Sequence, residues 1–332
     1  MSQSGARGAS ANIEIRMVAD VGGTNTRLAL FDPSNNTFRH TKSYINREHD
    51  SFAAVIEGWR DTLPEAFPRS ACLAIAAVPH DDHVAMLNMS WSFSKKESMA
   101  AFEFEKVLWL NDFAANAHAL PYLAEHDVEQ LYEGRPSLAS NEKLAVMGPG
   151  TGLGGATIEI AKATNRTCAC EPGHMGLSPG SKLESLLFAE LLKQHSHLYT
   201  ELLLSGPGLL RLYQTLGIIF NQACPAVSPA QVSRGAIDQS DKLAVQALDM
   251  FCALLGSTLG DFALATGSYG GVYLCGGIVP RILSSLKASD FYPRFCQRGA
   301  MSHHMESIPI FAITHSHPGL LGAAHAGLQP TD

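Results

Sequence analysis

Residues 17–31 read MVADVGGTNTRLALF, and this stretch places two adjacent glycines between two runs of strand-forming residues. The first run extends from Met17 to Ala19, and the second extends from Arg27 to Phe31. Apolar runs favour extended backbone, and a pair of glycines between two such runs is typical of a tight turn. The stretch therefore predicts a strand, a glycine turn and a second strand.

The glycine turn is suited to holding a phosphate group. Gly22 and Gly23 have no Cβ and tolerate positive φ, so the backbone can approach a ligand closely with its N–H groups. Asp20 lies just before the turn, and Thr24 and Asn25 follow it. A carboxylate with hydroxyl and amide groups beside backbone N–H donors suits a phosphate tail and its magnesium ion. A hairpin turn without any ligand is the alternative.

Strands and helices alternate along the rest of the chain, which indicates an α/β fold. In the first third, strands are expected at 72–78 and 107–110, and helices at 52–62 and 95–102. The second part repeats this order, with strands expected at 143–147, 156–161, 271–275 and 308–314 and helices at 182–193, 241–264 and 319–327. The repetition is one of architecture, because the residues themselves do not repeat.

A second glycine turn, GPGTGLGG at 148–155, has the glycine spacing of a dinucleotide-binding fingerprint. That fingerprint needs a helix directly after the turn, whereas residues 156–161 alternate as a strand does. A nicotinamide-dependent dehydrogenase is therefore disfavoured. The chain contains no Gly-Lys dipeptide, which excludes a Walker-type phosphate loop. The second turn instead predicts another phosphate-binding hairpin.

A third glycine corner, GGIVP at 276–280, follows the apolar residues 272–275 and precedes a helical pattern at 281–287. Such a corner can cover one face of a nucleoside. Glycine is also routine at strand-to-helix turns, so the corner alone does not distinguish a ligand contact from an ordinary connection.

Composition restricts the class of protein. The 332 residues are 46% hydrophobic, which is enough for two domains. The formal net charge of −7 leaves no basic surface for a nucleic acid, so no nucleic-acid partner is expected. The seven scattered cysteines indicate buried thiols in a reducing compartment, and the first 16 residues lack the apolar stretch of a signal peptide, so we expect a cytoplasmic location. The apolar run 248–265 is interrupted by Asp249 and Asp261 and is expected to be a buried helix, so no membrane is expected as a partner.

Six motifs occur in a fixed order along the chain: DVGGTN at 20–25, LNDF at 110–113, GTGLG at 150–154, LSGPGL at 204–209, GGIVPR at 276–281 and HPGLLG at 317–322. In this order they resemble the bacterial glucokinase family, in the hexokinase branch of the sugar kinase, heat-shock chaperone and actin superfamily. The resemblance implies an α/β, two-domain actin-like ATPase (ribonuclease H-like) fold with an interdomain cleft. It places a small domain at 13–122 plus 313–332 and a large domain at 123–312.

The resemblance also implies an activity, the phosphorylation of glucose to glucose 6-phosphate by ATP, the first step of glycolysis, and a homodimer. It assigns ATP binding to Asp20, Gly22, Gly23, Thr24, Asn25, Gly150, Thr151, Gly152, Gly154, Gly276, Gly277 and Ile278. It assigns glucose binding to Asn111, Asp112, Glu171, His174 and Glu201. Asp112 is the implied catalytic base, and Asp20 is expected to orient Mg²⁺, through water.

The chemistry of the sugar residues agrees with this assignment. Each sugar hydroxyl needs a donor or an acceptor once water is excluded, and short amide, carboxylate and imidazole side chains supply both. Alternatives remain: Asn111 and Asp112 are also an N-cap pair before the helical residues 114–120, and Glu201 is also an exposed helix residue.

The sugar loop departs from the family pattern. The family has Glu-Gly-Gly-His followed by an acid, whereas this chain has Glu171-Pro172-Gly173-His174-Met175-Gly176. The proline stiffens the loop and no aspartate follows, which leaves the range of hexoses open. Cys168, Cys170 and His174 also suggest a zinc site, but related zinc-binding proteins carry more cysteines close by.

Three rival functions share the fold. A broader-specificity hexose kinase has the same motifs. A sugar-responsive transcriptional repressor needs a helix-turn-helix ahead of the first hairpin, where only a short polar segment precedes Ile15. A non-catalytic nucleotide switch of the chaperone type lacks the hexose set.

Overall fold

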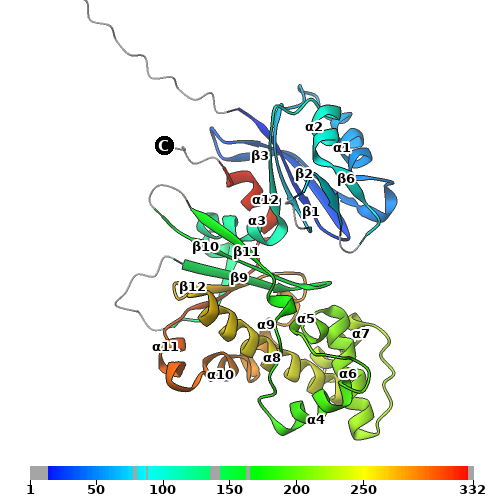
Figure 1. Cartoon of the computed structure of the whole chain (residues 1–332), viewed down its shortest axis with the longest axis vertical. Helices are drawn as coiled ribbons and strands as arrows, with labels where there is room; N and C mark the ends of the chain where they lie inside the picture. The colour runs from blue at the N-terminus through cyan, green and yellow to red at the C-terminus, as the bar shows by residue number, and fades with distance from the viewer. Residues whose placement is uncertain (1–13, 78–80, 87–88, 135–142, 162–164, 328–332) are drawn as a thin grey trace, which may run out of the picture. The chain divides into compact units, whose positions relative to one another are not determined.

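The computed structural model describes residues 14–77, 81–86, 89–134, 143–161 and 165–327. The chain divides into two compact units (Figure 1). In the described residues, unit 1 is 14–112 with 323–327, and unit 2 is 113–322. Of the first 16 residues, only 14–16 are among those described. The domain bounds expected from the resemblance, and the cleft between the domains, stay predictions.

Unit 1 is built on a sheet with the strand order β3-β2-β1-β4-β7. β1 and β2 are antiparallel, which confirms the predicted hairpin, while β1, β4 and β7 run parallel. The elements of this unit are β1 (Arg16–Val21), β2 (Asn25–Asp32), β3 (Thr37–Ile45), η1 (Asn46–Glu48), α1 (Phe52–Arg60), β4 (Ser70–Ile75), β5 (His83–Ala85), β6 (Ser92–Ser94), α2 (Lys95–Ala101) and β7 (Lys106–Asn111). The predicted helices at 52–62 and 95–102 and the strand at 107–110 correspond to α1, α2 and β7.

The two faces of β1 pack against different helices of unit 1. Met17 and Val21 are fully buried in a core that also contains Trp59 of α1. Side chains alternate between the faces of a strand, so Arg16 points to the opposite face. There its guanidinium donates to the carbonyl oxygens of Ala323 and Ala324, near the end of α12 (Pro318–His325). A strand and a helix 307 residues apart in the sequence are thereby joined.

Unit 2 contains a sheet with the strand order β11-β10-β9-β12-β13-β8. β9 (Lys143–Pro149) and β10 (Leu153–Glu159) form the second glycine hairpin, with Pro149 paired to Leu153. β10 is a strand, as the alternation predicted, and the dinucleotide fingerprint is therefore not followed by a helix. The other strands are β8 (Val128–Tyr132), β11 (Arg166–Cys170), β12 (Gly271–Leu274) and β13 (Ile310–Ile313).

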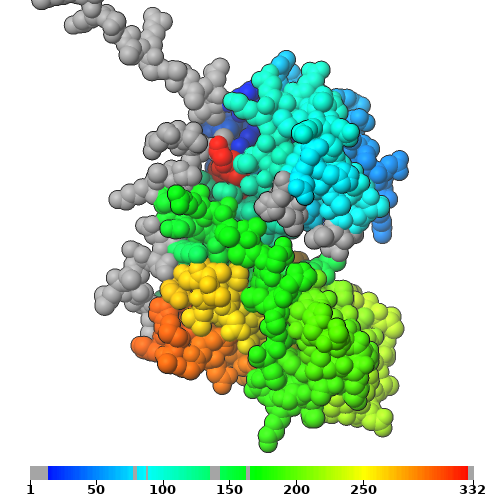
Figure 2. Space-filling view, in the orientation of Figure 1, coloured from blue at the N-terminus to red at the C-terminus, as the bar shows by residue number. Residues whose placement is uncertain are grey.

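In unit 2, helices α6, α7, α9 and α10 pack around the long helix α8 (Lys242–Thr266). Helices α4, α6 and α7 form the yellow-green lobe in Figure 2. Besides α8, the helices are α3 (Asp112–Ala119), η2 (Leu120–Tyr122), η3 (Glu125–Asp127), η4 (Pro172–His174), α4 (Lys182–Leu191), α5 (Thr200–Leu203), α6 (Gly206–Phe220), α7 (Pro229–Ile237), η5 (Val279–Arg281), α9 (Leu283–Ala288), α10 (Phe291–Cys296), η6 (Gly299–Met301) and α11 (Ser302–Met305).

Helix α8 is long and apolar enough to cross a membrane by length and composition alone. However, 78% of its most apolar window is buried inside the protein, which is the pattern of a core helix. The predicted buried helix over 248–265 is confirmed. The expectation that all seven cysteines are buried is wrong in part: Cys168 is exposed, and Cys170 and Cys224 are half-buried. Cys168 and Cys170 lie on β11, a strand at the edge of its sheet, where side chains are less covered.

Candidate functional site

The first glycine turn joins β1 to β2 and leaves room for a ligand. The Gly22 N–H donates to the Asn25 carbonyl oxygen at 3.0 Å across the turn. A Cβ built on Gly22 would meet only that oxygen, at an ordinary contact distance of 3.4 Å. The φ of Gly22 lies outside the left-handed region, so the turn uses the missing side chain of this glycine rather than its backbone freedom.

Asp20 precedes this turn and pairs with a residue that the sequence reasoning missed. Arg27 is its cross-strand partner, and the Arg27 Nη1 lies 3.2 Å from the Asp20 Oδ2. The pairing follows from the hairpin register, which can be read from the sequence once the turn is fixed at Gly22 and Gly23. The two side chains are mostly shielded, with 28% of Arg27 and 16% of Asp20 exposed.

Asn46 is a second missed residue, and it lies directly behind the turn. It is 2% exposed, and its side-chain Nδ2 donates to the Gly22 carbonyl oxygen at 2.8 Å. Its position one residue after β3 gave no signal in the sequence, because the contact depends on β3 pairing with β2.

The sheet of unit 1 brings the predicted base to the same edge as the first turn. Asn111 ends β7, and Asp112 begins α3. In the parallel register Val21 pairs with Ile75, and Ile75 pairs with Asn111, so the ends of β1 and β7 flank the end of β4. Strands lie about 4.8 Å apart, which places the two strand ends roughly 10 Å from each other. Asn111 is half-buried, and its Nδ2 donates to the Ala77 carbonyl oxygen at 3.4 Å.

The second glycine turn, in unit 2, is packed against protein groups at most of its glycines, although a Cβ on Gly150 would meet no atom within 4 Å. The Gly150 N–H donates to the Gly152 carbonyl oxygen, and the Gly150 carbonyl oxygen accepts from the Gly206 N–H, both at 2.8 Å. A Cβ on Gly154 would lie 2.1 Å from the Phe113 ring, and one on Gly148 would lie 2.6 Å from the Cys275 sulfur. These two glycines are therefore required for packing. Thr151 at the tip is exposed.

Glu201 lies beneath the second turn. Its Oε2 accepts from the Leu153 N–H at 2.8 Å, and a Cβ on Gly152 would come within 2.4 Å of the same oxygen. The Glu201 residue is half-buried in the first turn of α5, so it is not merely an exposed helix residue. A predicted sugar residue is thus bonded to the predicted phosphate hairpin.

The sugar loop is attached to the start of α5 through Thr200, another missed residue. The Thr200 N–H donates to the Met175 carbonyl oxygen at 2.9 Å, and its hydroxyl donates to the Pro172 carbonyl oxygen. Pro172 is buried and begins η4, whereas Glu171 and His174 on either side are exposed. The loop therefore presents Glu171 and His174 to solvent while its backbone is fixed.

The third glycine corner contacts the second hairpin within unit 2. Gly276 has a φ of +91°, and a Cβ there would lie 2.6 Å from the Pro149 carbonyl oxygen. This corner requires glycine for both its left-handed backbone and its close approach. Gly276 and Gly277 are exposed, and Ile278 packs on the core of unit 2. Within unit 2, the second glycine turn is therefore in contact with this corner through Pro149 and with α5 through Glu201, and α5 in turn holds the sugar loop through Thr200.

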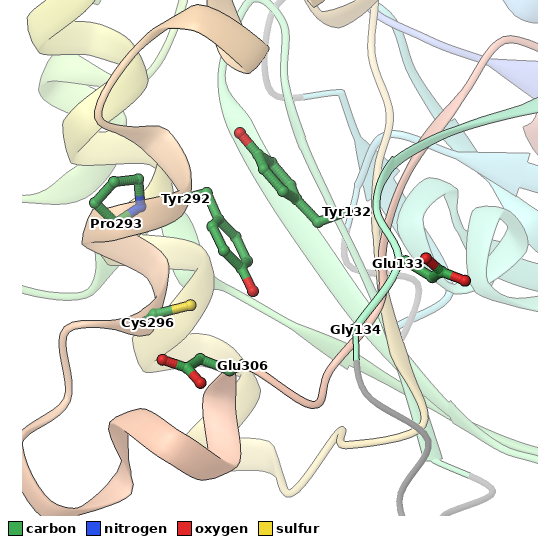
Figure 3. Close-up of a pocket in the computed structure, with 7 residues that line it drawn as sticks. All are labelled: Tyr132, Glu133, Gly134, Tyr292, Pro293, Cys296 and Glu306. Carbon is green, nitrogen blue, oxygen red and sulfur yellow. The ribbon is translucent and has the colours of Figure 1, made fainter.

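Neither a metal-ligand cluster nor the cavity shown in Figure 3 coincides with the predicted site in the described residues. Within the ranges that the structure describes, no group of three or more His, Cys, Asp or Glu side chains is placed to hold a metal ion. A cavity of about 540 Å³ is lined by Tyr132, Glu133, Gly134, Tyr292, Pro293, Cys296 and Glu306 (Figure 3), none of which is a predicted site residue. Its two tyrosine rings stack on each other with centroids 4.0 Å apart, and Glu133 points away from them.

Comparison with known proteins gives a consistent result. The family model described as Glucokinase matches residues 17–330. The glucokinase of Saccharophagus degradans strain 2-40 is 36% identical over 311 residues, covering 93% of this chain and 96% of that protein. The glucokinase of Colwellia psychrerythraea strain 34H is 39% identical over 316 residues, covering 93% and 95%.

Solved structures share the fold. The crystal structure of glucokinase from an Antarctic psychrotroph has a TM-score of 0.83 and 35% identity, covering 94% of this chain and 98% of that chain. A ROK family glucokinase from Streptomyces griseus, solved in complex with glucose and AMPPNP, has a TM-score of 0.62 at 18% identity, covering 93% and 98%. The latter likeness supports the fold alone. The α/β, two-domain actin-like ATPase fold expected from the sequence is confirmed.

Proposed function

The chain belongs to the glucokinase family, and we propose that it transfers the γ-phosphoryl group of ATP to the 6-hydroxyl of glucose, with Asp112 as the general base. The observation that carries the activity is the match to this family along nearly the whole chain, at 36% identity to a curated glucokinase and 35% identity to a solved one. The enzyme is a phosphotransferase that phosphorylates glucose with ATP. The positions of the groups that act are our proposal.

We propose that the two glycine hairpins bind the phosphates of ATP. In unit 1 the open turn at Gly22 offers backbone donors, which suit phosphate oxygens. In unit 2, Thr151 stands exposed at the tip of a turn that Glu201 and Gly206 hold in shape. Gly276, Gly277 and Ile278 are proposed to lie beside the adenosine.

Magnesium fits Asp20 as one carboxylate ligand, because Mg²⁺ is commonly held by one or two carboxylates together with substrate phosphates and water. A larger set of protein ligands is not needed for such a site. When bound, the ion would neutralise charge on the phosphates. The Arg27 guanidinium at 3.2 Å keeps the Asp20 carboxylate oriented and adds positive charge beside the proposed phosphate site.

We propose that Asn111, Glu171, His174 and Glu201 hold the glucose hydroxyls and that Asp112 accepts the proton of the 6-hydroxyl. Asp112 stands at the junction of β7 and α3, at the sheet edge that also carries Asp20. The exposure of Glu171 and His174 leaves them available to a ligand, since the loop backbone is already satisfied by Thr200. Phosphoryl transfer needs mainly positioning and charge stabilisation, and such fixed groups supply both.

A coupled assay tests this function. The purified protein is given glucose, mannose, fructose and N-acetylglucosamine in turn, each with ATP, ADP or polyphosphate as the donor. We expect the largest kcat/KM with glucose and ATP, and a loss of activity when magnesium is chelated. No turnover with any pair would contradict the proposed activity, and equal kcat/KM for several hexoses would favour the broader-specificity alternative.

We further propose that the enzyme acts as a cytoplasmic homodimer. The proposal of a dimer rests on the family resemblance alone, and the cytoplasmic location rests on the scattered cysteines, none of which forms a disulfide in the described residues. Sedimentation equilibrium tests the dimer: we expect twice the 35.6 kDa chain mass, and the mass of a single chain would contradict it.

A further inference from the structure

Asn46 forms hydrogen bonds to the first glycine turn through both its backbone and its buried side-chain amide. Its backbone N–H donates to the Thr24 carbonyl oxygen at 2.9 Å, and its Nδ2 donates to the Gly22 carbonyl oxygen at 2.8 Å. Its Oδ1 accepts from the Thr26 hydroxyl at 2.8 Å. Because a carbonyl oxygen only accepts, the bond to Gly22 fixes which way the amide group is turned.

These bonds set the direction of the peptide groups in the turn. In a trans peptide the N–H points opposite to the C=O. Since the Gly22 and Thr24 carbonyl groups face Asn46, the N–H groups of Gly23 and Asn25 point away from it. Two backbone donors are thereby presented on the face of the turn away from Asn46, which is the arrangement that binds anions.

Water cannot replace the hydrogen bonds of the Asn46 side chain, because this side chain is buried. Asn46 is 2% exposed and Thr26 is fully buried, so losing one partner would leave buried polar groups unsatisfied. Within the turn, the Gly22 N–H donates to the Asn25 carbonyl oxygen. The Gly22 carbonyl oxygen accepts from the Asn46 side chain. The shape of the turn therefore depends on this side chain.

We propose that Asn46 is a positioning residue for ATP, which holds the first hairpin in the conformation that binds the phosphates without touching the nucleotide. The inference rests on the proposed function. It predicts that removing the amide weakens ATP binding while glucose binding, which is assigned to other residues, is preserved.

The test measures KM for ATP and for glucose, and the Kd of AMPPNP by calorimetry, in Asn46→Ala, Thr26→Val and Ser51→Ala. We expect Asn46→Ala to raise the KM for ATP and the Kd of AMPPNP at least about tenfold, with the KM for glucose within about twofold, since the side-chain hydrogen bonds to the Gly22 carbonyl oxygen and from the Thr26 hydroxyl are both lost. Thr26→Val keeps the shape and the Asn46 amide but removes the hydroxyl, so an increase of about threefold is expected.

Ser51→Ala is the matched control. Ser51 lies five residues further along and caps α1 through a bond from the Ala54 N–H at 3.1 Å, so its loss lowers stability without reaching the turn. We expect unchanged constants for both substrates in this variant. Unchanged ATP constants in both Asn46→Ala and Thr26→Val, or equal rises for ATP and glucose, would overturn the inference while the wild type still phosphorylates glucose. An inactive wild type would instead contradict the proposed function.

Discussion

The two glycine hairpins have similar sequences but use their glycines differently. In unit 1, a side chain at Gly22 would meet only the Asn25 carbonyl oxygen at 3.4 Å, and the turn is supported from behind by Asn46. In unit 2, Cβ atoms at Gly148, Gly152 and Gly154 would each come within 2.6 Å of a protein atom. The first hairpin therefore leaves space for a ligand at Gly22, and the second is packed with protein at these three positions, while a Cβ on its Gly150 would meet no atom within 4 Å.

A glycine-rich turn thus has two physical origins. Where the space beside a glycine is open, the missing side chain allows a ligand to approach the backbone. Where the space is filled, the missing side chain allows another part of the protein to approach, as the Glu201 carboxylate does at Gly152. The same substitution is thus expected to affect binding in one hairpin and stability in the other.

The largest effect on activity is expected at Asp112. This residue lies outside both hairpins, so its substitution is compared with those in the hairpins. Asparagine keeps the shape of the side chain but cannot accept a proton, so Asp112→Asn should lower kcat by at least roughly a hundredfold. The KM for ATP and the melting temperature should stay close to those of the wild type. Single-turnover rates with glucose measure the effect. A variant with near wild-type kcat would remove Asp112 from the mechanism.

The next largest effect is expected at Glu201, where the second hairpin meets the sugar residues. Glu201→Ala removes the acceptor of the Leu153 N–H together with a proposed glucose ligand, so the KM values for both ATP and glucose should rise, each by roughly tenfold or more. Glu171→Gln and His174→Ala, in the exposed part of the loop, should raise the KM for glucose alone. Steady-state kinetics with each substrate varied separates these patterns. A rise confined to glucose in Glu201→Ala would show that its bond to the hairpin is unimportant for ATP.

A direct comparison of the hairpins uses one substitution in each. Gly148→Ala places a methyl group 2.6 Å from the Cys275 sulfur and 2.8 Å from its carbonyl oxygen, so we expect a loss of about 1–3 kcal/mol in the free energy of unfolding. Gly22→Ala should change that free energy by less than about 0.5 kcal/mol, because the contact is ordinary. Its KM for ATP should instead rise several-fold. Urea unfolding and steady-state kinetics of both variants measure this difference between the hairpins. An equal loss of unfolding free energy in the two variants would contradict it.

An effect on stability alone, with no change in substrate binding, is expected at His325, in the unit that carries the first hairpin. Burial, with a contribution from Arg16, lowers the pKa of this imidazole to about 4. In the unfolded chain its pKa is about 6.5, so between these values the unfolded state binds more protons. The stability contributed by neutral His325 is present above pH 6.5 and is lost as the pH falls towards 4. Urea unfolding of the wild type and of His325→Gln across this range should show the steeper decline in the wild type, and parallel curves would contradict it.

The sequence allowed the three glycine turns, the strand that follows the second turn and the buried helix α8 to be predicted, because each depends on local pattern. Contacts set by long-range packing could not be predicted in the same way. Asn46 reaches the first turn only because β3 pairs with β2, and Glu201 reaches Leu153 across 48 residues of sequence. Arg27 is an intermediate case, since the hairpin register places it opposite Asp20. Glycine patterns alone also could not distinguish the open turn from the packed one.

The contact between Arg16 and α12 has a consequence for synthesis on the ribosome. The first strand of unit 1 contains a buried guanidinium whose acceptors, Ala323 and Ala324, emerge more than 300 residues later. Until then this cation has no backbone carbonyl groups of α12 to bind, and the strand face beside it is uncovered. Unit 2, which comprises residues 113–322, is translated in the interval. The nascent chain must therefore keep its earliest sheet incomplete while its later unit folds, and this sheet is the surface that a chaperone would protect during translation.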